Sequence, residues 1–291
     1  MMIITMMMVM MMMMMMTSSD NSEVLSSSSS LSSPYIADTP CMSNKTYEGA
    51  DVCTSPSLGC RRFISDGVFS LQDVDRLKAI ARKALNARSS VNIGGPTIID
   101  INTGYIRDST NGLKNLFAGD KQLYDDADFS HYGRIIKKLK EHVESVFGID
   151  EVYFTAPTFI THIQGNKDWQ PQGIHDEYWH LHVDNNNTEH YHYSGLLYLS
   201  TYNDDFTGGR LKFFNHDETT LEQIIEPKAG RLAIFSSGRE NPHLFEMVTS
   251  GERMVLAFWF TCNESRKFHG RAHVTFAEKI KKGLNERQKE L

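Results

Sequence analysis

The sequence has few cysteines, and no two of them stand at the spacing of a zinc finger or a thiol redox motif. The four cysteines are Cys41, Cys53, Cys60 and Cys262, and none belongs to a C-x-x-C pair. This spacing excludes zinc-finger and thioredoxin-like proteins. In an oxidising compartment one or two disulfides could form, but four cysteines allow three full pairings, and the sequence does not choose among them.

The sequence also lacks an excess of basic residues. It has 36 acidic and 30 basic side chains, which gives a formal net charge of -6. Binding to a nucleic-acid backbone requires a basic face, so no nucleic-acid partner is predicted. The C-terminal basic residues, Lys279 to Lys282 with Arg287 and Lys289, are interleaved with Glu278, Glu286 and Glu290, which is typical of a solvated helix. We therefore expect residues 263–291 to form a charged and helical C-terminal tail.

Long hydrophobic runs are absent, apart from the first sixteen residues. Residues 1–16 carry no charge and are almost wholly apolar, but as a helix they would cover roughly 24 Å of a hydrocarbon layer of about 30 Å. The segment favours a signal peptide or a membrane anchor, although a basic n-region is missing and a mis-assigned start is an alternative. N-glycosylation triplets begin at Asn44, Asn186 and Asn263. We expect a membrane-associated or luminal protein of the secretory pathway.

The next two regions differ in composition. Residues 17–60 are rich in serine, too polar to bury a core, and are predicted to form a disordered stalk. Residues 61–150 show helical periodicity and are predicted to form a helical support region. One helix should follow Ser70 as its cap, and another should run from about Ser130 to Gly148.

Residues 151–262 change to short β-rich runs separated by turn residues. The predicted strands are 152–163, 179–184, 193–199, 210–214, 221–226, 231–236, 244–248 and 253–260. Such spacing indicates a mainly β fold, either a sandwich or a jelly roll. The preceding helices would brace one sheet from outside and leave the interior for a ligand.

Two histidines and an aspartate are the candidate metal ligands. His182 and Asp184 form an H-x-D sequence and would share one face of a strand, and His243 could supply the third ligand. Two imidazoles and one carboxylate leave three positions of an octahedral ion open, as in the facial triad of Fe(II) oxygenases. Alone, H-x-D is a weak signal among 12 histidines, and a pair of His180 with His182 is a competing possibility.

Arg253 strengthens this interpretation. It stands at the start of an apolar run, and a charge that enters a buried strand needs a partner. A guanidinium can bind the distal carboxylate of a 2-oxoacid through two hydrogen bonds. The alternative is a structural salt bridge at the strand end.

These residues belong to a series of motifs that resembles a known family. In order along the chain, the motifs are His182-Val183-Asp184, Leu196 to Leu199, Gly208-Gly209-Arg210-Leu211, Glu226 to Leu232, His243 and Arg253. Together they resemble the prolyl 4-hydroxylase-type 2-oxoglutarate dioxygenases over about residues 150–262. The stretch His175 to Asp184, with Gly94-Gly95-Pro96 upstream, is similar to the 2-oxoglutarate and iron-dependent oxygenase domain-containing proteins within that superfamily.

The resemblance implies both a fold and an activity. The fold would be a double-stranded β-helix. The enzyme would require Fe(II), 2-oxoglutarate, O₂ and ascorbate, and it would act on a protein or peptide. The iron ligands would be His182, Asp184 and His243. The 2-oxoglutarate would bind Arg253, and Tyr198 falls where relatives place a tyrosine that binds the same carboxylate. Some members of the family are single-pass membrane proteins, which agrees with an N-terminal anchor.

Two other functions are compatible with parts of the sequence. A jelly roll can be a binding module without catalysis, because fold does not determine function. A zinc hydrolase could use the same two histidines and aspartate, but Arg253 would then have no purpose. Trp169, Tyr178 and Trp179 could form an aromatic lid over the site or pack in the core.

Overall fold

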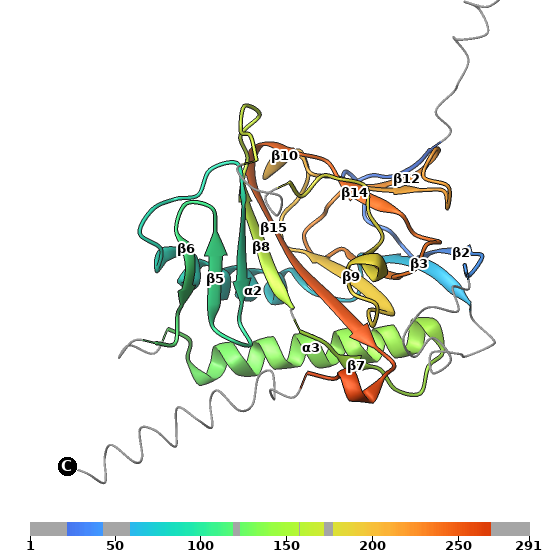
Figure 1. Ribbon diagram of the computed structural model, residues 1–291, viewed down its shortest axis with the longest axis horizontal. Helices are drawn as coiled ribbons and strands as arrows, with labels where there is room; N and C mark the ends of the chain where they lie inside the picture. The colour runs from blue at the N-terminus through green and yellow to red at the C-terminus, as the bar shows by residue number, and fades with distance from the viewer. Residues whose placement is uncertain (1–21, 43–58, 119–122, 157, 172–176, 269–291) are drawn as a thin grey trace, which may run out of the picture.

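The computed structural model describes most of the chain between residues 22 and 268 (Figure 1). The described residues are 22–42, 59–118, 123–156, 158–171 and 177–268. The apolar segment 1–16 and the greater part of the predicted tail lie outside these ranges. Within them, no helix is both long and apolar enough to cross a membrane.

Two sheets form the body of the protein, which confirms the predicted jelly roll. The major sheet has the strand order β2-β3-β13-β9-β15-β8-β4-β5-β6, and the minor sheet has the order β1-β12-β11-β14. The strands of the major sheet are β2 (Tyr35–Thr39), β3 (Cys60–Ser65), β13 (Leu232–Ser236), β9 (Tyr193–Tyr198), β15 (Val248–Thr261), β8 (Phe159–Gln164), β4 (Pro96–Asp100), β5 (Tyr105–Asp108) and β6 (Gly112–Asn115). Those of the minor sheet are β1 (Glu23–Leu25), β12 (Leu221–Ile225), β11 (Leu211–Phe214) and β14 (His243–Phe245). Two further short strands pair with β15, namely β7 (Tyr153–Phe154) and β10 (Phe206–Gly208).

Two helices brace the major sheet, as predicted. Helix α2 (Leu71–Asn86) begins after Ser70 with a capping box. Helix α3 (Asp126–Phe147) ends at Gly148, whose left-handed backbone suits glycine. This helix begins before Ser130, the predicted start. Its first turn carries Asp126 and Asp128, which are stabilised by the positive end of the helix dipole but add nothing to the apolar periodicity from which the start was predicted. Figure 1 shows α3 running beneath the strands of the major sheet.

The major sheet separates two hydrophobic cores. Side chains of α2 and α3 pack with one face of the sheet, including Leu197, Leu256 and Phe258. The opposite face packs against the minor sheet, through residues such as Leu196 and Val255. Alternate residues of β9 and β15 therefore serve different cores, as the twofold period of a strand requires. The second face is the one that carries the candidate site.

The region 61–150 is less helical than predicted. Besides the two helices it contributes β3 and the hairpins β4, β5 and β6 to the major sheet. In β4 and β5 the buried residues alternate with more exposed ones, as in a strand that packs on one face only. These strands have only four or five residues, and the helical periodicity of the neighbouring segments is the stronger signal, so the sequence did not predict them.

The prediction of a disordered stalk at 17–60 is wrong for its described residues. Strand β1 pairs with β12, strand β2 pairs with β3, and Cys41 forms a disulfide with Cys60. The fully buried Arg231 binds this segment, because its guanidinium donates hydrogen bonds to the carbonyl oxygens of Leu25 and Ser26. A serine-rich segment can thus be ordered by backbone contacts, which its composition does not reveal.

Candidate functional site

His182 and His243 lie opposite each other in an isolated antiparallel bridge. The amide of His182 donates to the carbonyl of His243 and the amide of His243 donates to the carbonyl of His182, each at 2.9 Å. The predicted strand at 179–184 is therefore wrong, because only this bridge forms and the short helix α4 (Asp184–Asn187) starts immediately after it. Asp184 reaches the histidines from the first residue of that helix.

The three side chains lie close enough to share one metal ion. Their candidate ligand atoms are within 4.8 Å of one another, and Asp184 is 3.6 Å from Nε2 of His182 and 3.8 Å from Nε2 of His243. The Nδ1 of His182 is 2.9 Å from the carbonyl of His180, and the Nδ1 of His243 is 3.0 Å from the carbonyl of Asn241. Such contacts hold the proton on Nδ1 and leave Nε2 as the free ligand atom, as in metal sites generally. The arrangement fits a divalent ion of borderline hardness.

Charge and burial prepare the same atoms for a metal. Burial lowers the pKa of His243 to about 4, which keeps this imidazole neutral. Burial acts to raise the pKa of Asp184, but the two histidines outweigh it and lower that pKa, so the carboxylate is ionised. Burial also opposes protonation of His182, but Asp184 reverses the effect and raises the pKa of His182. A buried carboxylate between two imidazoles is the charge pattern that a cation requires.

A second layer around His243 was not predicted from the sequence. The buried Arg62 of β3 donates from Nε to the side-chain oxygen of Asn241 at 2.7 Å, and the amide of Asn241 donates to the carbonyl of Ser236. The guanidinium of Arg62 also lies over the ring of Phe213, 4.4 Å from its centroid. These contacts fix the segment whose backbone carbonyl orients His243. Only the fold brings Arg62 to this place, so no local pattern could have shown it.

Arg253 is buried without a negative partner among the described residues. Its side chain makes one described hydrogen bond, from Nε to the carbonyl of Gly209 at 3.1 Å, and Nη2 is buried with no hydrogen bond. The guanidinium lies 5.2 Å from the ring centroid of Phe245 and 5.8 Å from that of Tyr198. Burial lowers the pKa of Arg253 from its usual value. The structural salt bridge considered from the sequence is thus not found in the described part of the chain.

Two tyrosines lie near Arg253, and the sequence indicated one of them. The hydroxyl of Tyr198 is buried and has no hydrogen-bond partner among the described residues, and burial raises its pKa to about 12. The hydroxyl oxygen of Tyr178 accepts a hydrogen bond from the amide of Val248 at 3.0 Å, which leaves its own proton free to be donated. Tyr178 lines the cavity described next, whereas Tyr198 is not among its lining residues.

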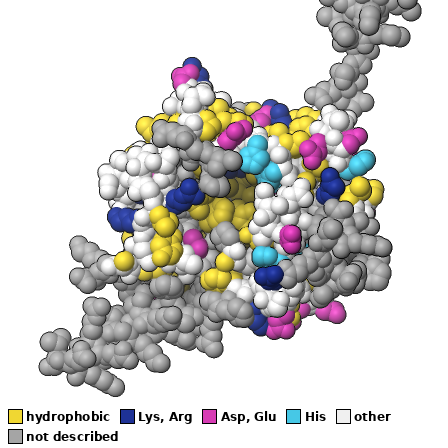
Figure 2. All heavy atoms as spheres, viewed as in Figure 1, with side chains coloured by type: hydrophobic (Ala, Val, Ile, Leu, Met, Phe, Trp, Pro, Cys, Tyr) yellow, Lys and Arg dark blue, Asp and Glu magenta, His cyan; other side chains and the backbone are white. Residues whose placement is uncertain are grey.

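A cavity of about 630 Å³ joins the metal-ligand cluster to Arg253. Figure 2 shows it as a hollow with an apolar floor. Polar side chains of the wall are His182, Asp184, His243, Arg253, Glu177, Tyr178, His180, Asn187, Ser194 and Thr161, and apolar ones include Ile98, Phe159, Val255, Ala257 and Trp259. Such a volume suits a small dicarboxylate together with one substrate side chain.

The aromatic residues before the H-x-D motif pack against one another. The ring of Trp169 lies on Gly94, where a β-carbon would come within 2.1 Å of it, and contacts Trp179 edge to face. Trp179 in turn contacts Tyr178 edge to face. His180 is exposed, and its Nδ1 lies at the carbonyl of Glu177. The cluster of possible ligands contains His243 and not His180 beside His182 and Asp184, so the alternative pair of His180 with His182 is not supported.

The chain belongs to the 2OG-Fe(II) oxygenase superfamily, whose family model matches residues 170–261, the part of the chain that carries this site. The protein is accordingly an enzyme that uses Fe(II), 2-oxoglutarate and O₂. It is 34% identical over 236 residues to 2-oxoglutarate and iron-dependent oxygenase domain-containing protein 3 of Homo sapiens, a match that covers 78% of this chain and 70% of that protein.

Two further comparisons involve proteins named as prolyl hydroxylases. The chain is 30% identical over 238 residues to prolyl 3-hydroxylase 1 of Gallus gallus, which covers 74% of this chain and 31% of that protein. A solved prolyl hydroxylase of Trichoplax adhaerens, in complex with a peptide fragment of the hypoxia inducible factor oxygen degradation domain, has 18% identity and a TM-score of 0.46. That comparison covers 70% of this chain and 85% of the solved one.

Proposed function

We propose that this dioxygenase hydroxylates a side chain of a protein or peptide, in the manner of a prolyl hydroxylase, with release of succinate and CO₂. His182, Asp184 and His243 would hold the iron. Arg253 would bind the distal carboxylate of 2-oxoglutarate, and Tyr198 would stand beside it as a hydrogen-bond donor. With iron, 2-oxoglutarate and O₂ bound, the site supplies oxidative decarboxylation coupled to insertion of oxygen into a C–H bond.

The observation that carries this proposal is the buried charge of Arg253 on the wall of the cavity that holds the three ligand side chains. A buried cation without a partner is costly, and a bound carboxylate would remove that cost. A zinc hydrolase or a binding module that lacks an anionic ligand would leave the charge uncompensated. The same argument makes the free protein less stable than its complex with the oxoacid.

The protein itself contributes positioning and exclusion of water. The carbonyl of Gly209 orients the guanidinium of Arg253, which can then grip a carboxylate with its remaining nitrogens. Tyr178 can donate its free proton to the same anion, because its oxygen is already occupied by the amide of Val248. Phe245 covers the guanidinium and keeps the pair dry, which strengthens it.

The rest of the cavity favours an apolar substrate side chain. Ile98, Phe159, Val255, Ala257 and Trp259 line it, from three neighbouring strands of the major sheet. A prolyl side chain is apolar, compact and of suitable size. The resemblance to proteins named prolyl 3-hydroxylases supports such a substrate.

A secretory location and a requirement for ascorbate are further parts of the proposal. The Cys41–Cys60 disulfide favours an oxidising compartment, and Asn186 of one glycosylation triplet is exposed. Attachment to a membrane through residues 1–16 rests on their apolar composition alone. Treatment of the cellular protein with an N-glycosidase tests the location, and a cytosolic, unglycosylated and reduced protein would contradict it.

The activity is tested with purified protein, Fe(II), 2-oxoglutarate, ascorbate and synthetic proline-containing peptides. We expect peptide-dependent formation of succinate and a peptide whose mass has increased by one oxygen atom. The His182→Ala variant is the control and should form neither product. Succinate formation that no peptide stimulates, together with unmodified peptides, would contradict a peptide hydroxylase.

A further inference from the structure

The major sheet extends beyond the cavity, and its outer part has one open face. Strands β4, β5 and β6 continue the sheet past β8, which itself lines the cavity. On their inner face, Ile99 and Ile106 are buried in the core of the helices. On the outer face, Tyr105 is 42% exposed and Leu113 is 67% exposed. Large apolar side chains on an open sheet face indicate a binding surface when they adjoin a functional site.

One row of paired residues connects this face to the cavity without a break. Val255 of β15 pairs with Thr161 of β8, and Thr161 pairs with Ile98 of β4. Ile98 pairs with Arg107 of β5, and Arg107 pairs with Leu113 of β6. Directly paired residues of antiparallel strands point to the same side of the sheet. Because Val255, Thr161 and Ile98 line the cavity, Arg107 and Leu113 continue its wall outward.

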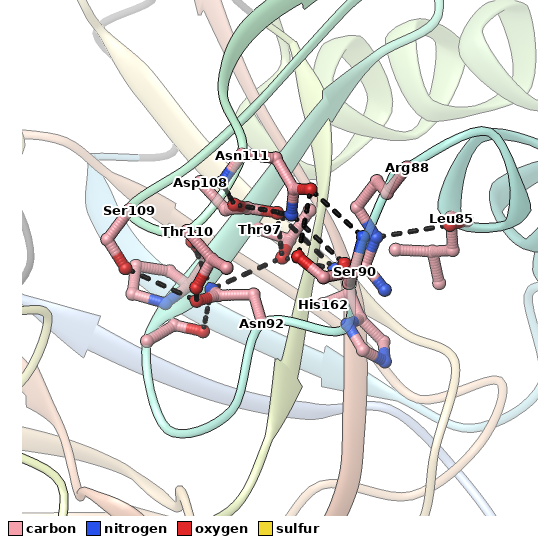
Figure 3. Close-up of polar contacts among 12 residues, drawn as sticks. Leu85, Arg88, Ser90, Asn92, Thr97, Asp108, Ser109, Thr110, Asn111 and His162 are labelled. Carbon is pink, nitrogen blue, oxygen red and sulfur yellow. Dashed lines mark hydrogen bonds and ion pairs between the residues drawn. The ribbon is translucent and has the colours of Figure 1, made fainter.

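The open face is held rigid from behind by a buried polar network (Figure 3). Asp108 of β5 accepts hydrogen bonds from Thr97 of β4 at 3.3 Å and from Arg88 at 3.4 Å. Asn92 donates to the carbonyl of Gly95 at 2.9 Å and accepts from Thr110 at 2.8 Å. Satisfied networks of this kind fix one arrangement of the strands, so the surface is preformed.

Arg107 is the exposed cation in the middle of this surface. No hydrogen bond or ion pair of Arg107 is found within the described ranges. On the same face, the carboxylate of Asp100 accepts hydrogen bonds from the amides of Asn102 and Thr103 and from the hydroxyl of Thr103. Among the described residues, Arg107 is therefore a positive charge that has no ion pair and lies between apolar side chains. Figure 2 shows apolar side chains gathered over β5 and β6 beside the hollow.

We propose that the outer face of β4, β5 and β6, formed by Ile98, Tyr105, Arg107 and Leu113 and called the shelf, docks the polypeptide whose side chain enters the cavity. We further propose that Arg107 pairs with an acidic residue of that polypeptide. The proposal rests on the proposed function, because it requires a peptide substrate. Beyond that function, the shelf specifies where the substrate polypeptide lies on the enzyme and that Arg107 recognises an acidic residue of the substrate.

The spacing of the strands sets the position of the acidic residue. Neighbouring strands are about 4.8 Å apart, so Arg107 lies roughly 10 Å from Thr161 and Leu113 roughly 14 Å from it. An extended peptide advances about 3.3 Å per residue. The acidic residue should therefore stand about three or four residues from the hydroxylated one, with an apolar residue just beyond it.

The test uses a synthetic library of peptides with a fixed central proline, in which one glutamate is placed at each flanking position in turn. With the full-length protein, hydroxylation should be fastest when glutamate stands about three or four residues away on one side. Arg107→Gln should abolish this preference, and Arg107→Glu should transfer it to lysine at the same position. Leu113→Asp should raise the KM for the preferred peptide while leaving the KM for 2-oxoglutarate unchanged. Lys137→Glu, on the exposed side of α3, is the matched control and should change nothing.

Three outcomes would contradict the proposal that the shelf docks the substrate polypeptide. Hydroxylation with the same positional preference in the wild type and in Arg107→Glu would show that the peptide lies elsewhere, with the proposed function intact. Conversion of a dimer into monomers by Leu113→Asp would show that the surface joins two copies of this chain. A library in which no peptide is hydroxylated would contradict the peptide hydroxylase itself, and the shelf with it.

Discussion

His182 and His243 exchange both of their backbone hydrogen bonds across a single antiparallel bridge, with N···O distances of 2.9 Å. Two candidate ligands from distant parts of the chain are thus held together by the backbone. Their relative position does not depend on their side chains or on a metal ion. The site is therefore expected to be preformed in the metal-free protein.

The first prediction follows from this bridge. His182→Ala should abolish stoichiometric iron binding and leave the metal-free protein folded, because the backbone hydrogen bonds remain. Iron should raise the melting temperature of the wild type, since a ligand at a hundredfold its Kd stabilises by about 2.7 kcal/mol. The variant should show no such rise. Tight, stoichiometric iron in His182→Ala would contradict the assignment of this ligand.

The second prediction concerns the layer behind His243. Asn241→Ala leaves Nε of the buried Arg62 without its acceptor, which should cost about 1–3 kcal/mol of stability. Because the backbone of residue 241 orients His243, the affinity for iron should also fall, by about 10–100-fold. Asn263→Ala, which removes hydrogen bonds from an exposed turn, is the control and should leave iron affinity unchanged. Equal iron affinity in both variants would show that the layer is only structural.

The third prediction concerns two glycines with left-handed backbone. Gly209 and Gly112 have φ of 68° and 69°, so alanine at either position should cost about 1–2 kcal/mol of stability. A β-carbon at Gly209 would also lie 2.8 Å from Cδ of Arg253, whereas one at Gly112 would meet open space. Gly209→Ala should therefore raise the KM for 2-oxoglutarate, and Gly112→Ala should not. Steady-state kinetics and melting curves of both variants check this, and equal KM values would refute it.

The fourth prediction concerns pH and the attachment of α2 to β15. Glu252 receives hydrogen bonds from His162 at 2.8 Å and from Arg82 at 2.7 Å, and the bond from His162 is the largest cause that lowers its pKa to about 2. A lowered carboxyl pKa stabilises the folded state above the ordinary value near 4.5, and this stabilisation is lost as the pH falls toward about 2. Urea unfolding should thus find the wild type more stable than Glu252→Gln at about pH 6 and equally stable at the acid limit. A difference that does not shrink with acid would contradict the ion pair.

The sequence predicted the chemistry of the site better than its local structure. His182, Asp184 and His243 do lie together, but the reason first given, a shared strand face, is wrong. Asp184 begins a helical turn, and the bridge to His243 replaces the strand. Two residues that are separated by one can lie together on a strand or at the start of a helical turn. The prediction that these residues meet therefore rested on their types, two histidines and an aspartate, and not on the periodicity of a strand.

Contacts between distant parts of the chain were beyond sequence patterns. Arg62 supports His243 only because β3 lies beside β13. Arg231 orders the serine-rich segment only because the fold brings the carbonyls of Leu25 and Ser26 within hydrogen-bond distance of its guanidinium. A polar composition predicts that a segment cannot bury a core of its own. It does not reveal that a buried arginine elsewhere will bind the segment's backbone carbonyls.

The central claim is that Arg253 anchors the distal carboxylate of 2-oxoglutarate, and one comparison of the wild type with Arg253→Gln tests it most directly. The measurement is the KM for 2-oxoglutarate, taken with bound iron and melting temperature on the same preparations. Loss of a charge-assisted contact of about 1.5–3 kcal/mol should raise the KM roughly 10- to 100-fold. Iron binding should survive, and the free variant should be at least as stable as the wild type, because an uncompensated buried charge has been removed. An unchanged KM, with a lower melting temperature and lost iron, would show that Arg253 only supports the strand and would contradict the account.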